Sequence, residues 1–166
     1  MTVNMKNRNE LTKVALRIDG LSIKKEIVLC EPLEKGSFIV RNIPAFVYGV
    51  GYGDKIQLQS EESGDFSITH RECNIAIRVF VNGTLDCPEI DRVIEGVTRA
   101  EGLYEIARNA NEENNSSLLL LSFPIAIGFP EIEKLMASLQ SLDAKWEYAN
   151  VYDESGEALN WWLPEK

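Results

Sequence analysis

The order in which the hydrophobic period changes along the chain most constrains its fold. Up to residue 71, apolar and polar side chains alternate in short runs, which is the period of β-strands. From residue 74 onward, two runs with the spacing of an amphipathic helix are interleaved with runs of strand period. The sequence therefore predicts an α+β protein with an all-β first half and a mixed second half.

Turn signals such as Asp19-Gly20 and the polar segment 60–65 divide the first half into short strands. The expected strands cover residues 14–18, 23–29, 37–41, 55–59 and 66–71. Short strands with tight turns and no helix are typical of a small β-barrel or a curled antiparallel sheet. Residues 11–72 are assigned to this all-β subdomain.

The second half begins with a strand and continues into a helix that opens at Pro88. Its expected elements are a strand at 74–81, a helix from 88 to about 102, strands at 103–108 and 118–123, a helix from Pro130 to Leu142, and a strand at 145–151. This order is that of a ferredoxin-like βαββαβ unit, with both helices on one face of a four-stranded antiparallel sheet. Residues 73–152 are assigned to this subdomain, and 153–166 to a C-terminal tail that contains Trp161 and Trp162.

Charge is distributed unevenly along the chain, which has a formal net charge of −9. Residues 1–83 hold 11 Lys and Arg against 10 Asp and Glu, whereas residues 84–166 hold 6 against 16. An acidic surface repels the phosphates of nucleic acids and of anionic membranes, so neither is an expected partner. It favours fast capture of a basic protein through long-range steering.

Composition places the chain among globular proteins that fold without disulfides or metals. Its 166 residues include three cysteines at spacings that match no disulfide framework or zinc pattern, and the polar first ten residues do not resemble a secretory signal. No apolar run approaches the roughly 18 residues that cross a bilayer. These features predict a cytoplasmic protein without a cofactor or a metal.

Catalytic chemistry has few candidate residues. His70 is the single histidine and falls in a strand, with no nucleophile motif such as G-x-S-x-G in the chain. Cys30 and Cys73 fit packing positions. Cys87 precedes Pro88 at a helix start, where the helix dipole lowers a thiol pKa, so Cys87 is the thiol to test. The sequence does not predict an enzyme.

The segment from Ile43 to Asp54 is the most informative stretch of the chain. Glycines at 49, 51 and 53 alternate with Tyr48, Val50 and Tyr52, which allows a sharp bend or a close approach of another chain. Two interpretations remain open. The segment is a barrel corner that fills its own core, or it forms an aromatic groove lined by Phe46, Tyr48, Tyr52 and Asp54.

The same segment resembles the IP-F-YG-xx-YGD signature of a bacterial family of domains of unknown function. A hairpin, a strand like 75–80, a glycine-led strand like 102–106 and the segment Trp146-Glu147-Tyr148 follow it, as in members of that family. The resemblance covers residues 11–152 and implies a small cytoplasmic bacterial protein. It implies no catalytic residues.

Two functional hypotheses follow. In the first, the chain is a non-catalytic immunity protein that occludes the active site of a basic toxin domain, such as a nuclease, with carboxylates that mimic phosphates. The proposed contacts are Glu89, Asp91, Glu95, Glu112 and Glu113. In the alternative, the chain is a small-molecule or regulatory module that uses the groove around Tyr48 and Tyr52. The sequence does not predict the oligomeric state.

Overall fold

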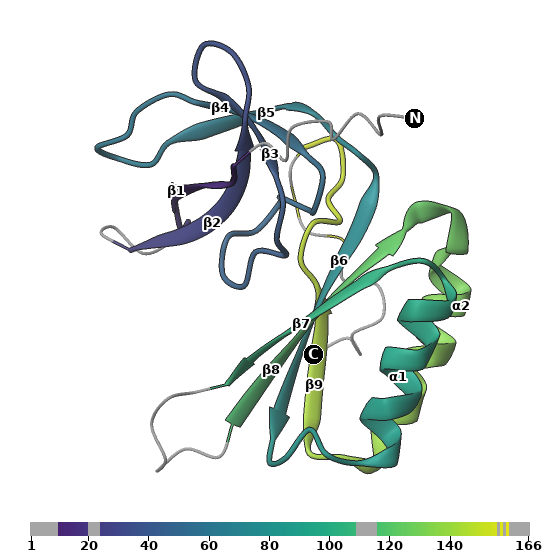
Figure 1. Cartoon of the computed structure of the whole chain (residues 1–166). Coiled ribbons are helices and arrows are strands. Elements are labelled where there is room, and N and C mark those ends of the chain that lie inside the picture. The colour runs from purple at the N-terminus through teal and green to yellow at the C-terminus, as the bar shows by residue number, and fades with distance from the viewer. Residues whose placement is uncertain (1–9, 20–23, 109–115, 156, 158, 160–166) are drawn as a thin grey trace, which may run out of the picture.

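The computed structural model describes residues 10–19, 24–108, 116–155, 157 and 159, and contains two antiparallel sheets with two α-helices (Figure 1). The strands of the first sheet all precede residue 72 and those of the second all follow it. This confirms the mixed class and the change from all-β to α+β. The division into subdomains at 11–72, 73–152 and 153–166 stays a prediction.

The first sheet has the order β1-β2-β3-β4-β5, in which each strand pairs with the next along the chain. Its strands are β1 (Thr12–Arg17), β2 (Lys25–Pro32), β3 (Ser37–Val40), β4 (Lys55–Leu58) and β5 (Phe66–His70). Inward-facing residues such as Leu16, Val28 and Ile56 are fully buried in one core. The alternation that predicted the strands is the alternation that fills this core.

The barrel interpretation is wrong, because the sheet does not close: β1 and β5 are its two edges and are not paired. The sheet curls instead, so that the loop between β4 and β5 reaches β1. The N–H of Arg17 donates to the carbonyl of Gly64 at 2.9 Å. Gly64 has φ +76°, and a Cβ there would strike the backbone of Ala15 and Arg17. The expected curled antiparallel sheet is therefore observed.

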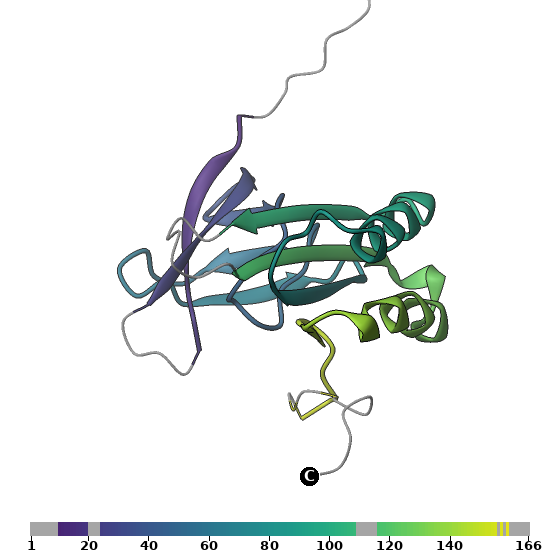
Figure 2. The same cartoon turned by 90° about the horizontal axis from the view of Figure 1, so that it is seen from below.

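The second sheet has the order β7-β8-β6-β9, with every neighbouring pair antiparallel. Its elements are β6 (Asn74–Asn82), α1 (Pro88–Arg99), β7 (Leu103–Arg108), β8 (Ser116–Pro124), α2 (Phe129–Met136) and β9 (Ala144–Tyr148). Both helices lie on the same face of this sheet, and the first sheet lies on the other side (Figures 1 and 2). The core under the helices joins Ile77 and Leu121 of the strands to Val93 and Ile132 of the helices.

Three predicted boundaries need correction. The second helix changes at Ala137 into a 3-10 turn, η2 (Ala137–Ser141), which still buries Leu139; a single turn of the same kind, η1 (Ile125–Ile127), precedes α2. The first helix ends at Arg99, earlier than expected. The last strand ends at Tyr148. Beyond it, the Asn150 side chain accepts the N–H of Ala76 and donates to the carbonyl of Asn74, which replaces backbone pairing with β6 at this point.

The face of the second sheet that lacks helices presents its side chains in cross-strand rows. In the first row, Leu103 of β7 is followed by three small residues, Ser122, Ala76 and Ala149. The next contains Glu105, Leu120, Arg78 and Glu147, and the third contains Ala107, Leu118, Phe80 and Lys145. Small side chains in the first row let another segment approach the sheet closely, whereas Phe80 in the third row is 43% exposed.

Gly102 allows α1 to turn tightly into β7. A Cβ at this position would collide with the carbonyl oxygen of Ser122, which is backbone and cannot rotate away. We predict that Gly102→Ala lowers the free energy of unfolding by about 2 kcal/mol, the usual effect of overpacking. Urea unfolding followed by circular dichroism measures this change.

The matched control is Gly96→Ala. The atoms nearest to a Cβ at Gly96 all belong to the Leu135 side chain, which is not backbone and can change rotamer, and alanine is favoured over glycine within a helix. Its loss of stability should be the smaller of the two. An equal or larger loss for Gly96→Ala would contradict this account of the two positions.

Candidate functional site

Residues 41–54, here called the connector, join the two sheets by packing into both cores. Val47 and Val50 are buried with the first sheet. Ile43 is buried against Ala76, Leu118 and Leu120 on the helix-free face of the second sheet. The segment therefore does contribute to the core of its own sheet, as the first interpretation held, but it also covers the small-residue row of the other sheet.

Two carboxylates satisfy the backbone of the connector, which belongs to no helix or strand. Glu26 of β2 accepts the N–H groups of Ala45, Phe46 and Val47 at 2.6 to 2.8 Å. Glu105 of β7 accepts the N–H of Ile43 at 2.8 Å. Residue 44 is proline and has no N–H, so every donor from 43 to 47 has a carboxylate partner. One carboxylate comes from each sheet.

Burial raises the pKa of Glu105, and the charge of nearby Glu26 raises it further, while the hydrogen bond from Ile43 lowers it. A carboxyl whose folded pKa lies above its ordinary 4.5 binds more protons in the folded state than in the unfolded state. Its contribution to stability therefore falls as the pH rises from 4.5 through the raised pKa. The two carboxylates hold the connector although they repel one another.

Arg78 of β6 lies beneath the connector and is 2% exposed. Its Nη2 donates to the Val47 carbonyl at 2.7 Å, and its Nη1 lies 3.8 Å from a Glu147 carboxylate oxygen. The Tyr48 ring stacks on the guanidinium, with 4.1 Å between the central carbon and the ring centroid. The Arg78 Nε is buried and has no hydrogen-bond partner among the described residues.

The second part of the connector is a turn fixed by Asp54, which is buried. One carboxylate oxygen accepts the N–H of Gly51 and the other accepts the N–H of Glu72, both at 2.9 Å. Burial raises the Asp54 pKa, and these two bonds lower it. Asp54 therefore closes a structural turn, and the Tyr52 carbonyl nearby accepts from Asn74. Neither Asp54 nor Tyr52 lines the groove described next.

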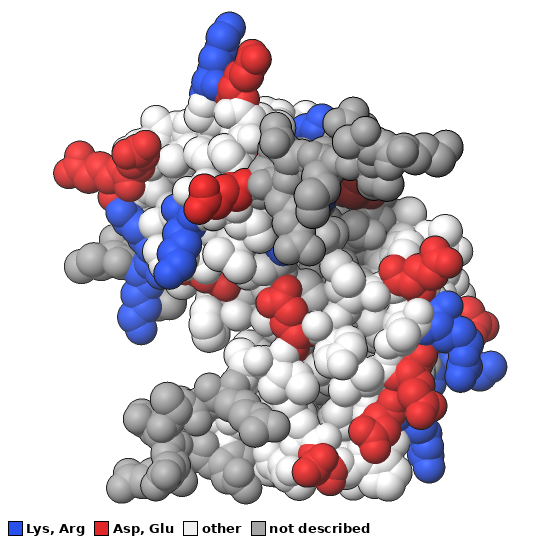
Figure 3. Space-filling model, viewed as in Figure 1, with Lys and Arg blue, Asp and Glu red and all other residues white. Residues whose placement is uncertain are grey.

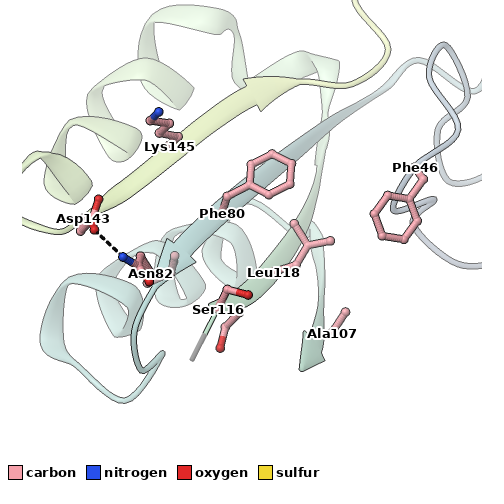
Figure 4. Close-up of a pocket in the computed structure, with 10 residues that line it drawn as sticks. Phe46, Phe80, Asn82, Ala107, Ser116, Leu118, Asp143 and Lys145 are labelled. Carbon is pink, nitrogen blue, oxygen red and sulfur yellow. Dashed lines mark hydrogen bonds between the residues drawn. The ribbon is translucent and has the colours of Figure 1, made fainter. Parts of the chain in front are cut away.

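A groove runs along the helix-free face of the second sheet, beside the part of that face that the connector covers. It consists of two adjoining pockets of ≈ 740 and ≈ 650 Å³ that both contain Phe46 and Phe80, and we call it the Phe80 groove. Phe46 is 55% exposed. Figure 4 shows Phe46 on the opposite side of the ≈ 650 Å³ pocket from Phe80 and Leu118. Large apolar side chains left open in a concave site are the usual mark of a binding surface.

The structure therefore contains an aromatic groove, but the residues that line it differ from those predicted. Phe46 and Tyr48 line it, whereas Tyr52 and Asp54 do not. Phe80, which sequence reasoning missed, is shared by both pockets. Its signal was available: Ala76, Arg78 and Phe80 alternate with the apolar face of β6, so this strand has few polar positions on either side. Near one end of the groove, Asn82 donates to Asp143 at 2.8 Å (Figure 4).

The predicted acidic contacts do not form one uniform patch. Asp91 and Glu95 are exposed on α1, but Arg92 and Arg99 are exposed on the same helix. Figure 3 shows acidic and basic side chains intermingled along the helical side of the molecule. Glu89 is half-buried and lies 3.5 Å from the Ser141 hydroxyl. Glu112, Glu113, Trp161 and Trp162 lie outside the described residues.

The candidate reactive residues lie apart from the groove. His70 is exposed at the end of β5. Cys87 lies at the start of α1, as its position before Pro88 predicted, and is the N-cap residue of that helix. Cys30 is buried, and burial raises the pKa of its thiol to about 11. Within the described ranges, no group of three or more His, Cys, Asp or Glu side chains is arranged to hold a metal ion, and no helix is long and apolar enough to cross a membrane.

We predict that Glu26→Gln loosens the connector, because an amide has one oxygen acceptor where the carboxylate has two. Charge-assisted bonds to three N–H groups are weakened, so the free energy of unfolding should fall by about 1 to 3 kcal/mol. Urea unfolding provides the measurement. Glu34→Gln, in the exposed turn between β2 and β3, removes the same charge elsewhere and should change stability little. Equal losses in the two variants would contradict the proposed role.

The model of the DUF4265 family, a domain of unknown function, matches residues 26–148. The match spans most of the chain, which therefore belongs to this family. No match was found among curated proteins. A solved structure, described as a hypothetical protein from Neisseria gonorrhoeae, superposes with a TM-score of 0.61 over 87% of this chain and 96% of its own, at 16% identity. That likeness shows a shared fold.

Proposed function

We propose that this member of the DUF4265 family is a non-catalytic binding protein whose ligand inserts an apolar group between Phe46 and Phe80. The observation that supports this proposal most is the sharing of these two exposed rings by two adjoining pockets. The groove lies between elements of both sheets, and the connector fixes their separation. A site formed in this way is rigid before the ligand arrives, which lowers the entropic cost of binding.

The sheet rows explain why the groove has an apolar floor. Leu118 and Lys145 flank Phe80 on the neighbouring strands, and Ala107 follows Leu118 on the next strand. Ala107 and Leu118 leave space beside the ring, while the connector covers the rows above. A ligand in this space would remove both rings from water, and burial of one phenyl ring contributes about 1.5 to 3 kcal/mol.

The test is binding of the uncharged dye Nile red, followed by its fluorescence. We expect saturable binding to the wild-type protein and affinity about tenfold lower for Phe80→Ser. The matched control is Leu33→Ser, since Leu33 is 41% exposed but lies in the turn after β2, outside the groove. Absence of saturable binding, or equal weakening by both substitutions, would refute the proposal.

A second candidate function is immunity against a basic toxin domain, and the observation that favours it is the charge of the second half. Six Lys and Arg against 16 Asp and Glu after residue 83 produce a field that attracts a basic partner. Exposed Asp91 and Glu95 extend this field on α1, although Arg92 and Arg99 weaken it. The site would be the helical side of the molecule, which faces away from the first sheet (Figure 1), whereas the Phe80 groove lies on the helix-free face of the second sheet.

Immunity predicts a one-to-one complex with the product of the neighbouring gene at moderate salt, and rescue of growth on co-expression. The double substitution Asp91→Lys/Glu95→Lys should slow association and weaken the complex about tenfold, with a weaker salt dependence, as measured by surface plasmon resonance. The control is Glu34→Lys/Glu61→Lys on the first sheet. Binding that is unchanged by the α1 substitutions and by high salt would exclude the electrostatic form of this function.

Finer assignments belong to the same proposal. We infer that the second sheet and its helices are a ferredoxin-like unit, which the order β7-β8-β6-β9 and the one-sided helices support. We infer that Ile43 to Asp54 is the family signature, since the matched region contains it. We also propose that the protein works in the cytoplasm, which the three unpaired, described cysteines support.

A further inference from the structure

One end of the Phe80 groove is basic in a protein that is otherwise acidic. Of the described residues that line the ≈ 740 Å³ pocket, Lys24, Lys25 and Arg78 are basic and Asp19 is acidic. Two of the cations are exposed side chains at the start of β2, and the third is the buried guanidinium of β6. The rest of the chain carries a large negative charge, so this local excess of positive charge is a specific feature of the pocket.

Arg78 is the strongest indication of the ligand's charge. A guanidinium has five N–H donors, and burial of a donor without an acceptor costs free energy. Arg78 is 2% exposed, yet no described residue accepts a hydrogen bond from its Nε, and its carboxylate neighbour Glu147 is 3.8 Å from Nη1. The protein therefore compensates this cation only in part, and an anion in the pocket would complete its hydrogen bonding.

The remaining walls of the pocket are apolar. Ile18, Ala45, Phe46 and Phe80 line it together with the Tyr48 ring that stacks on Arg78. Its volume lies within the range of pockets that enclose drug-sized molecules. In Figure 3 the hollow opens between the two sheets, with Lys and Arg side chains above it and acidic side chains also at its margin.

We propose that this end of the groove binds a small amphipathic anion, a carboxylate with an aliphatic or aromatic body. The body lies between Phe46 and Phe80, and the carboxylate accepts hydrogen bonds from Arg78 and pairs with Lys24. This inference rests on the proposed function, since it uses the same groove. It further specifies that the ligand is negatively charged, so a positively charged partner would be repelled from this end of the groove.

Three probes with one chain and different head groups test the charge: decanoate, decan-1-ol and decylammonium. Each competes with Nile red on the wild-type protein at low salt. We expect decanoate to bind about tenfold more tightly than decan-1-ol, the effect of one or two charge-assisted hydrogen bonds, and decylammonium to bind most weakly. Equal affinities for the three probes would overturn the inference.

Residue-specific readouts locate the head group. In the wild-type protein, the Arg78 Nε–H resonance should shift on addition of decanoate but not of decan-1-ol, because this donor gains an acceptor. Lys24→Gln should weaken decanoate about threefold and leave decan-1-ol unchanged. The control is Lys13→Gln, an exposed lysine of β1 that does not line the pocket. Equal effects of the two substitutions, or an unmoved Nε–H signal, would reject this placement.

The two proposals fail in different ways. If Nile red binds, the three probes bind with equal affinity and Phe80→Ser weakens their binding, then the groove is a binding site. In that case only the proposal that the ligand is an anion is refuted. If Nile red shows no saturable binding and decanoate does not bind, both are refuted. These measurements use the intact chain, so neither depends on a substitution of buried Arg78.

Discussion

Capture of the connector's backbone by two carboxylates is the interaction on which the arrangement of the two sheets depends. Glu26 belongs to the first sheet and Glu105 to the second, and between them they accept the N–H groups from residue 43 to residue 47. A buried segment without regular structure needs such acceptors, because unpaired donors away from water are costly. Without them, the connector could not cover the small-residue row of the second sheet.

This arrangement also determines where the binding groove lies. The connector covers the rows that contain Ala76 and Arg78 but does not cover Phe80 in the next row. Phe80 therefore stays exposed, and so does Phe46, which belongs to the connector itself. The exposed rings are therefore a consequence of how far the connector extends across the sheet. The same segment positions Tyr48 over Arg78, so one structural element fixes both the apolar and the cationic part of the groove.

The sequence was sufficient to predict the strands and helices, but it was insufficient to predict the groove and the contacts that form it. Alternation and helical spacing predicted the strands and helices. In β6, for example, the apolar residues Ile75, Ile77 and Val79 recur at period two and fill the core under the helices. The role of the two carboxylates that hold the connector could not be predicted, because Glu26 and Glu105 have the pattern of ordinary solvent-facing charges in strands. Their role depends on contacts 19 to 62 residues away along the chain. Period alone does not contain that information.

The distribution of charge separates the two functional hypotheses in space. Net charge of the second half favours a basic partner, but the acids of α1 lie on the helical side, whereas the groove on the opposite side of the sheet gathers Lys24, Lys25 and Arg78. Because charges farther apart than about 8 Å are largely screened at physiological salt, each surface recognises its partner by its local charge. The net charge of the chain therefore does not describe the groove, which must be assessed by its own lining, and that lining is aromatic and basic.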